Sequence, residues 1–236
     1  MLFRSPRPFQ FLRQGDEFGW REQINGNLFL GLYVETGRIK DKDGYNLKTA
    51  LREAISQFPL EIRLTPSQNI LLANIRKSDQ GAIDAIFRKH GVPTENQGTI
   101  LRRASMACPA MPTCGLALAE SERALPDILG RIEGLLGELG LASEEIVIRM
   151  TGCPNGCARP YMAEIGFVGR APNKYQLYLG GNEASTRLNR LYKENVKTDD
   201  IVNELRPVLS RFKQERTGAE RFGDFCARTL WSANAS

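Results

Sequence analysis

The sequence Leu47-Lys-Thr-Ala-Leu-Arg-Glu-Ala-Ile-Ser-Gln-Phe58 has apolar residues at helical spacing and is followed directly by Pro59. Residues with this spacing lie on one side of an α-helix, and that side must pack against another apolar surface. Pro59 cannot continue the helix, because its ring removes a backbone donor and clashes with the preceding turn. We therefore expect a helix over residues 47–58. Its predicted inner face comprises Leu47, Ala50, Leu51, Ala54, Ile55 and Phe58.

The segments around this helix predict a small sheet. Residues 27–35 are apolar and aromatic, residues 61–65 alternate apolar with polar side chains, and residues 69–75 are nearly all apolar, so each reads as a strand. Ser78 is a candidate N-cap for a second helix over residues 78–90. The order strand–helix–strand–strand–helix is typical of a ferredoxin-like α/β sandwich, in which helices cover a sheet.

The rest of the chain also mixes helices and strands, so the predicted fold class is α+β. Helical periodicity runs over residues 116–139, where Pro126 should break or restart the helix. Further expected elements are strands at 146–150, 165–168 and 175–179 and a helix at 199–216.

Four of the five cysteines form two close pairs, Cys108-Pro-Ala-Met-Pro-Thr-Cys114 and Cys153-Pro-Asn-Gly-Cys157. Four thiolates at such spacing can converge on one metal centre. Spacing and ligand type favour an iron–sulfur cluster, because structural zinc usually has shorter C-x2-4-C arms. Zinc and unligated or redox-active thiols remain alternatives. The fifth cysteine, Cys226, is expected to be a small buried apolar residue.

Composition and charge narrow the class of protein. The chain has 236 residues, a net charge of +5 and interleaved acidic and basic residues. It has no apolar run of membrane-spanning length and no recognisable signal peptide, which predicts a cytoplasmic protein whose thiols stay reduced. We expect no membrane or nucleic-acid partner, since no motif supports one. The single histidine, His90, falls at a predicted helix end and is not expected to bind metal.

The cysteine segments carry a resemblance to a known family. Residues 106–123 and the stretch Val147-Ile-Arg-Met-Thr-Gly-Cys-Pro-Asn-Gly-Cys-Ala-Arg-Pro160 closely resemble the cofactor signature of assimilatory sulfite reductase haemoproteins. The related nitrite reductases share the cysteine spacing. The resemblance runs from about Phe18 to Arg228 and covers the C-terminal half of the family's haemoprotein. Further matching segments are Gly31–Ile39, Arg63–Asn69, Leu179–Asn182, Tyr192–Asn195 and Phe222–Phe225.

The resemblance implies cofactors and their ligands. In this family the matching cysteines hold a [4Fe–4S] cluster, and the last of them also binds the iron of sirohaem. By position the cluster ligands are Cys108, Cys114, Cys153 and Cys157, with Cys157 as the shared ligand. Asn155 is implied to contact the haem or to cap its loop, and Gly180, Gly181 and Asn182 to lie near the haem edge or form a turn.

The resemblance also implies a division of the chain and a set of partners. Residues 1–17 would form an arm or linker, 18–95 a ferredoxin-like repeat, and 96–236 the domain that binds the [4Fe–4S] cluster and sirohaem. The implied reaction is the six-electron reduction of sulfite to sulfide, with ferredoxin favoured over an NADPH flavoprotein as electron donor. The family's N-terminal repeat has no match here, so no catalytic residue is assigned. That repeat is expected either on a partner chain or in a longer native polypeptide. A nitrite reductase and a non-catalytic iron–sulfur electron-transfer fragment are the alternatives.

Overall fold

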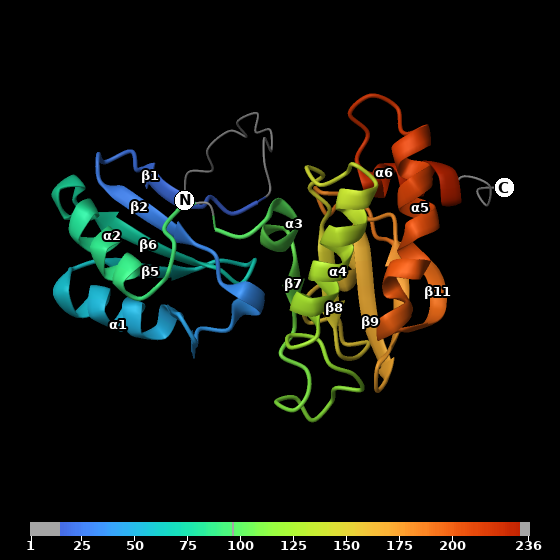
Figure 1. Ribbon diagram of the computed structural model, residues 1–236, viewed down its shortest axis with the longest axis horizontal. Helices are drawn as coiled ribbons and strands as arrows, with labels where there is room; N and C mark the ends of the chain where they lie inside the picture. The colour runs from blue at the N-terminus through green and yellow to red at the C-terminus, as the bar shows by residue number, and fades with distance from the viewer. Residues whose placement is uncertain (1–14, 96, 232–236) are drawn as a thin grey trace, which may run out of the picture.

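The structure is a computed structural model that describes residues 15–95 and 97–231. Most of the arm expected over residues 1–17 therefore lies outside the described residues. The described chain forms two main sheets, each with its own helices and its own apolar core, and a separate two-stranded hairpin (Figure 1). This confirms the predicted α+β class with a ferredoxin-like first part.

The first sheet is antiparallel and four-stranded, in the order β1-β2-β6-β5. Helices α1 (Leu47–Gln57) and α2 (Gln80–Lys89) pack on it, and their buried residues share one core with strands β2 and β6. A short hairpin precedes α1. The strands are β1 (Gly19–Glu22), β2 (Leu28–Leu32), β3 (Asp41–Lys42), β4 (Tyr45–Asn46), β5 (Glu61–Leu64) and β6 (Ile70–Ile75).

Two expectations for the first sheet need correction. Ser78 does not cap α2, because residues 77–79 form a 3-10 turn and the Ser78 hydroxyl donates to Asp79 instead. Ile55, expected on the inner face of α1, is 41% exposed. The predicted helix and strand types are otherwise confirmed.

The second sheet has five strands in the order β11-β10-β9-β8-β7, parallel from β7 to β9 and antiparallel from β9 to β11. Helices α4, α5 and α6 contribute to its core, while α3 joins the two parts of the chain (Figure 1). The strands are β7 (Met106–Ala107), β8 (Ile148–Thr151), β9 (Ile165–Ala171), β10 (Lys174–Leu179) and β11 (Arg190–Lys197). The helices are α3 (Ile100–Arg103), α4 (Leu125–Glu138), α5 (Ile201–Glu215) and α6 (Phe222–Leu230).

Of the helix expected over residues 116–139, only the part from residue 125 onward forms. Residues 111–124 form turns, and α4 begins only at Leu125, with Pro126 in its first turn. Proline suits that position, because the first backbone N–H groups of a helix have no partner inside it. Pro126 therefore starts the helix rather than interrupting it.

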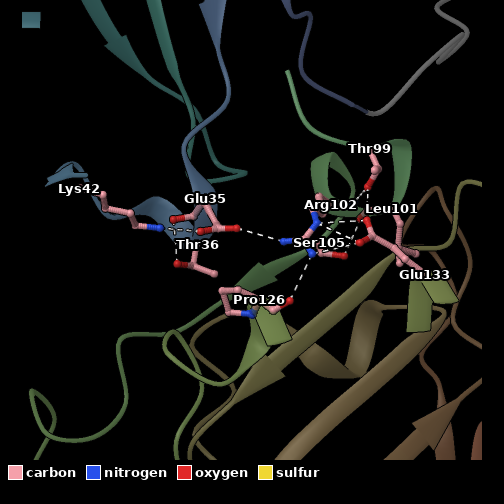
Figure 2. Close-up of polar contacts among 9 residues, drawn as sticks. All are labelled: Glu35, Thr36, Lys42, Thr99, Leu101, Arg102, Ser105, Pro126 and Glu133. Carbon is pink, nitrogen blue, oxygen red and sulfur yellow. Dashed lines mark hydrogen bonds and ion pairs between the residues drawn. The ribbon is translucent and has the colours of Figure 1, made fainter. Parts of the chain in front are cut away.

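Polar side chains join the two parts of the chain. Arg102 on α3 forms ion pairs with Glu133 on α4 at 3.0 Å and with Glu35 of the first part at 3.1 Å (Figure 2). The Gln68 amide makes two hydrogen bonds to the backbone of Ala107, at 2.7 and 3.1 Å. These contacts fix strand β7 against the first sheet.

No helix among the described residues is both long enough and apolar enough to cross a lipid bilayer.

Candidate metal centre

Both cysteine pairs begin where two neighbouring parallel strands end. Met106 and Ala107 of β7 lie opposite Arg149 and Met150 of β8, and the Cys108 N–H donates to the Met150 carbonyl at 3.1 Å. Because the carboxyl ends of parallel strands meet at one edge of a sheet, the two cysteine loops leave the same edge. Cys108 and Cys153 therefore start their loops side by side.

Gly152 packs one cysteine loop against the other. Its N–H donates to the Cys108 sulfur at 3.3 Å, and its carbonyl accepts from Leu118 and Ala119 at 2.8 and 3.0 Å. A Cβ at this position would lie 2.6 Å from the Ala119 carbonyl oxygen and 2.7 Å from the Ala110 Cβ. Only glycine fits this crossing, and its amide stabilises negative charge on a cysteine sulfur.

The four motif cysteines differ in exposure. Cys108 and Cys153 are each 8% exposed, Cys114 is partly buried, and Cys157 is exposed. Within residues 15–95 and 97–231, no three His, Cys, Asp or Glu side chains form a group that could hold a metal ion. The ligand set of Cys108, Cys114, Cys153 and Cys157 therefore remains a prediction.

Four thiols are a donor set that suits a zinc ion or an iron–sulfur cluster, and the two require different spacings of the sulfurs. Zinc binds thiolates at about 2.3 Å in a tetrahedron, which requires the sulfurs to lie within roughly 4 Å of one another. A [4Fe–4S] cluster bonds each thiolate to a different iron, so its ligands stand further apart. The loops supply soft thiols, the Gly152 N–H directed at sulfur, and a buried Thr151 hydroxyl that lacks a partner among the described residues. These features suit a polar inorganic group at this edge.

Tyr161 supports the second cysteine loop and was not identified from the sequence. Its hydroxyl donates to the Pro154 carbonyl at 3.3 Å, and its ring lies 3.2 Å from where a Gly156 Cβ would stand. Tyr178 packs edge-on against the same ring at a centroid distance of 5.2 Å. Asn155, in the middle of the loop, is exposed.

Gly180, Gly181 and Asn182 form a tight connection after β10. A Cβ on Gly181 would lie 2.2 Å from the Ala163 carbonyl oxygen, and Gly180 has a φ of 97°. The Asn182 side chain accepts from the N–H groups of Thr186 and Arg187, at 2.9 and 3.0 Å. This geometry gives the segment a turn-forming role.

A second contact missed by the sequence holds the first cysteine loop. The Arg38 guanidinium forms a two-pronged ion pair with Glu122, and Nε lies 2.7 Å from Oε1. The Glu122 N–H in turn donates to the Cys108 carbonyl at 3.1 Å. The first part of the chain thus reaches the first cysteine through one buried carboxylate.

The two residues expected to play no part in the metal site have other environments. His90 lies at the end of α2, with Nε2 at 2.6 Å from a Glu53 oxygen. Cys226 is fully buried in the core of the second sheet, where burial raises the pKa of its thiol. Both placements agree with the sequence-based expectations.

Comparisons with known proteins match this architecture. Residues 21–90 match the nitrite/sulfite reductase ferredoxin-like half domain. The chain is 51% identical over 225 residues to a "Sulfite reductase [NADPH] hemoprotein beta-component" of Staphylococcus epidermidis, covering 95% of this chain and 39% of the relative. It is 52% identical over 230 residues to a "Sulfite reductase [ferredoxin]" of Synechococcus elongatus, covering 98% and 36% respectively.

Among solved structures, the NirA protein of Mycobacterium tuberculosis superposes with a TM-score of 0.76 at 24% identity, over 95% of this chain and 42% of that one. That likeness supports the fold alone. The chain spans about 39% of the length of the first curated relatives it matches. The resemblance in the cysteine segments is therefore confirmed, for a chain that corresponds to part of its relatives.

Proposed function

We propose that this relative of the sulfite reductase haemoproteins, with its nitrite/sulfite reductase half domain at residues 21–90, is the cluster-bearing part of a sulfite reductase. The observation that carries the proposal is the pair of cysteine loops leaving adjacent parallel strands and locked together at Gly152. The division into an arm at 1–17, a repeat at 18–95 and a cofactor domain at 96–236 is part of this proposal.

The chain's own residues would hold the cofactors as follows. Cys108, Cys114, Cys153 and Cys157 would bind a [4Fe–4S] cluster, and Cys157, the exposed one, would face sirohaem. When bound, the coupled cluster and sirohaem supply single electrons for the six-electron reduction of sulfite to sulfide. The Gly152 N–H holds charge on the Cys108 sulfur, and Asn155 would lie at the haem side of its loop. Since the thiols must stay reduced, we propose a cytoplasmic location.

The electron donor is open between two classes. The sequence favoured ferredoxin, but relatives of nearly equal identity carry both the NADPH and the ferredoxin names. The ferredoxin preference therefore has no support from the comparisons. The net charge of +5 would suit an acidic electron donor of either class, so charge does not decide between them.

The whole activity would require polypeptide that this chain does not match. The chain corresponds to about 39% of its relatives, and no basic residue here is assigned to sulfite. We therefore propose a partner segment with the first repeat, which completes the haem pocket. A nitrite reductase would use the same loops with a different anion, and an electron-transfer fragment would hold the cluster alone.

The test is to produce the chain together with an N-terminal half from a relative, in cells that make sirohaem. We expect iron, acid-labile sulfide, sirohaem absorption and sulfite-dependent oxidation of reduced methyl viologen. Cys157→Ser should lose the sirohaem absorption, whereas the control Cys226→Ala should retain it because Cys226 lies in the core. Iron and sulfide without sirohaem would select the electron-transfer alternative, and faster oxidation with nitrite would select the nitrite reductase. Stoichiometric zinc without iron would refute the cluster.

A further inference from the structure

A cavity of about 100 Å³ lies where the two parts of the chain meet, and none of the four motif cysteines lines it. Asp16 and Phe18 line it from the first part, and Arg103 lines it from the end of α3. Met106 and Arg149 line it from the paired strands β7 and β8, where they are direct neighbours. Both parts of the chain therefore bound the cavity, and on one side the pairing of β7 with β8 fixes its wall.

Arg149 enters this cavity without a partner for its charge. Its side chain is partly buried, and its Nε atom is buried with no hydrogen-bond partner among the described residues. Its Nη1 atom donates one long hydrogen bond, of 3.5 Å, to the carbonyl oxygen of Arg159. No carboxylate in the described part of the chain forms an ion pair with it.

This arrangement costs free energy in the unliganded protein. Burial, and then the positive charge of Arg159, lower the pKa of Arg149 to about 10. Arg149 thus keeps its proton at neutral pH and carries a charge that is partly removed from water. Buried charges are normally paired, because leaving one uncompensated is destabilising.

The acidic residues around the cavity already have partners. Asp16 accepts hydrogen bonds from Thr65 and Asn69, at 2.6 and 2.7 Å. Glu145 and Glu183 both face Arg221, at 3.9 and 3.1 Å. Among the cations, Arg103 stacks on the Phe18 ring at 5.5 Å, which leaves its N–H groups available for a ligand. The three acids therefore do not satisfy Arg149.

We propose that this cavity binds a small free oxyanion or carboxylate, of the size of sulfate or acetate, through Arg149 with help from Arg103. A guanidinium matches such an anion, because its planar N–H groups donate to two oxygens at once. The volume is well below the roughly 300 Å³ at the low end of sites for larger organic ligands. All the residues that line the site belong to this chain, and none of them is a motif cysteine.

The test compares thermal unfolding of the chain in sodium sulfate, sodium acetate and sodium chloride at matched ionic strength. We expect sulfate to raise the unfolding temperature in a saturable way in the wild type. Arg149→Met and Arg149→Gln should lose that saturable rise, while Arg170→Gln, at an exposed arginine on β9, should keep it. Sulfate also stabilises most proteins non-specifically. The Arg149 variants measure that non-specific part, which is subtracted from the rise seen in the wild type.

A second measurement does not depend on anion titration. In chloride buffer, Arg149→Met should unfold at a higher temperature than the wild type, because it removes a partly buried charge that has no partner of opposite sign. Saturating sulfate should reduce or reverse this difference in unfolding temperature between the variant and the wild type. Should an Arg149 variant fail to fold, calorimetric titration of sulfate into the wild type and into Arg103→Gln decides the matter, with weaker binding expected for the variant. The same sulfate response in the wild type and in Arg149→Gln, or no calorimetric binding to the wild type, would overturn the proposal.

Discussion

The glycines beside the cysteines differ in what requires them, and Gly152 is required by contacts with another part of the chain. Gly152 lies where the backbone of residues 117–119 crosses the second cysteine loop, and Gly169 on β9 would place a Cβ 2.3 Å from the Gly152 carbonyl oxygen. Gly115, beside Cys114, has open space around it and an ordinary φ. Two glycines that look alike in the sequence therefore have different structural roles.

Gly152→Ala should destabilise the protein and separate the two cysteine loops. The added methyl group would overlap backbone atoms, which cannot move as a flexible side chain can, so we expect a loss of about 1–3 kcal/mol in unfolding free energy. Gly115→Ala is the matched control and should stay within about 0.5 kcal/mol of the wild type. Urea unfolding of both variants measures the difference. Equal stabilities would show that the loops do not pack as described.

The five thiols should react in the order of their exposure. In metal-free protein, Cys157 should be alkylated first and Cys114 next, with Cys108 and Cys153 slower. Cys226 should stay unmodified until the protein unfolds, because it is fully buried and burial raises the pKa of its thiol. Mass spectrometry after timed alkylation gives the order. Early modification of Cys226 would contradict the core described for the second sheet.

At the scale of elements, hydrophobic periodicity predicted the helices and strands that bury one continuous face. It gave wrong predictions where contacts with distant parts of the chain determine the local structure. Helix α1 was predicted because its apolar stripe and Pro59 are both local signals. The apolar residues Leu116 and Leu118 suggested helix, yet this segment is a loop whose backbone bonds to Gly152. Strand β11 was missed because most of its residues are partly or fully exposed and polar.

In the candidate site, too, some residues could be predicted from the sequence and others could not. Spacing alone marked the cysteines as candidate ligands, because the ligands of one metal centre often lie close together in a sequence. Arg38 and Glu122 are 84 residues apart, and Gln68 and Ala107 are 39 apart. No local pattern signals such pairs, so the contacts that position the cysteine loops became visible only in the folded chain.

A buried carboxylate attaches helix α6 to the second sheet. Glu164, fully buried before β9, accepts from the N–H groups of Val147 and Gly223, both at 2.9 Å, and pairs with Arg221 at 3.1 Å. Burial raises the pKa of Glu164, so a neutral replacement of the same shape is tolerated better than a truncation. The carboxylate thus joins three segments through one side chain.

Glu164→Ala should therefore cost about 3–5 kcal/mol, because it leaves two backbone donors unsatisfied and removes one of the three carboxylates that face Arg221. Glu164→Gln keeps one acceptor oxygen and should cost clearly less. Glu215→Ala removes an exposed ion pair with Arg211 and should change stability by less than about 1 kcal/mol. Guanidinium unfolding monitored by circular dichroism measures all three. A Glu164→Ala loss as small as that of Glu215→Ala would refute this role.

At the scale of the whole molecule, the two parts of the chain keep separate apolar cores and meet through polar side chains. One core belongs to the first sheet with α1 and α2, and the other to the second sheet with α4, α5 and α6. Between them lie the ion pairs of Arg102 (Figure 2), the Arg38–Glu122 pair and the Gln68 bonds to Ala107. Polar interfaces of this kind permit relative motion of domains. Each hydrogen bond or ion pair across this interface therefore helps to hold β7 and the first cysteine loop in place.

Gln68→Asn should loosen this junction without disturbing either core. Gln68 has a φ of 70°, which asparagine tolerates, but the shorter amide cannot reach Ala107 with both of its bonds. The loss of two partly buried hydrogen bonds should cost about 1–3 kcal/mol and speed amide exchange at Ala107 and Cys108. Exchange within α1, in the first core, should stay unchanged. Arg63→Gln, which removes an exposed pair with Glu61 on β5, is the control and should leave exchange at β7 as in the wild type. Hydrogen exchange followed by mass spectrometry reads both regions at once, and equal protection of β7 in Gln68→Asn and wild type would mean that the first sheet does not hold the cysteine loop in place.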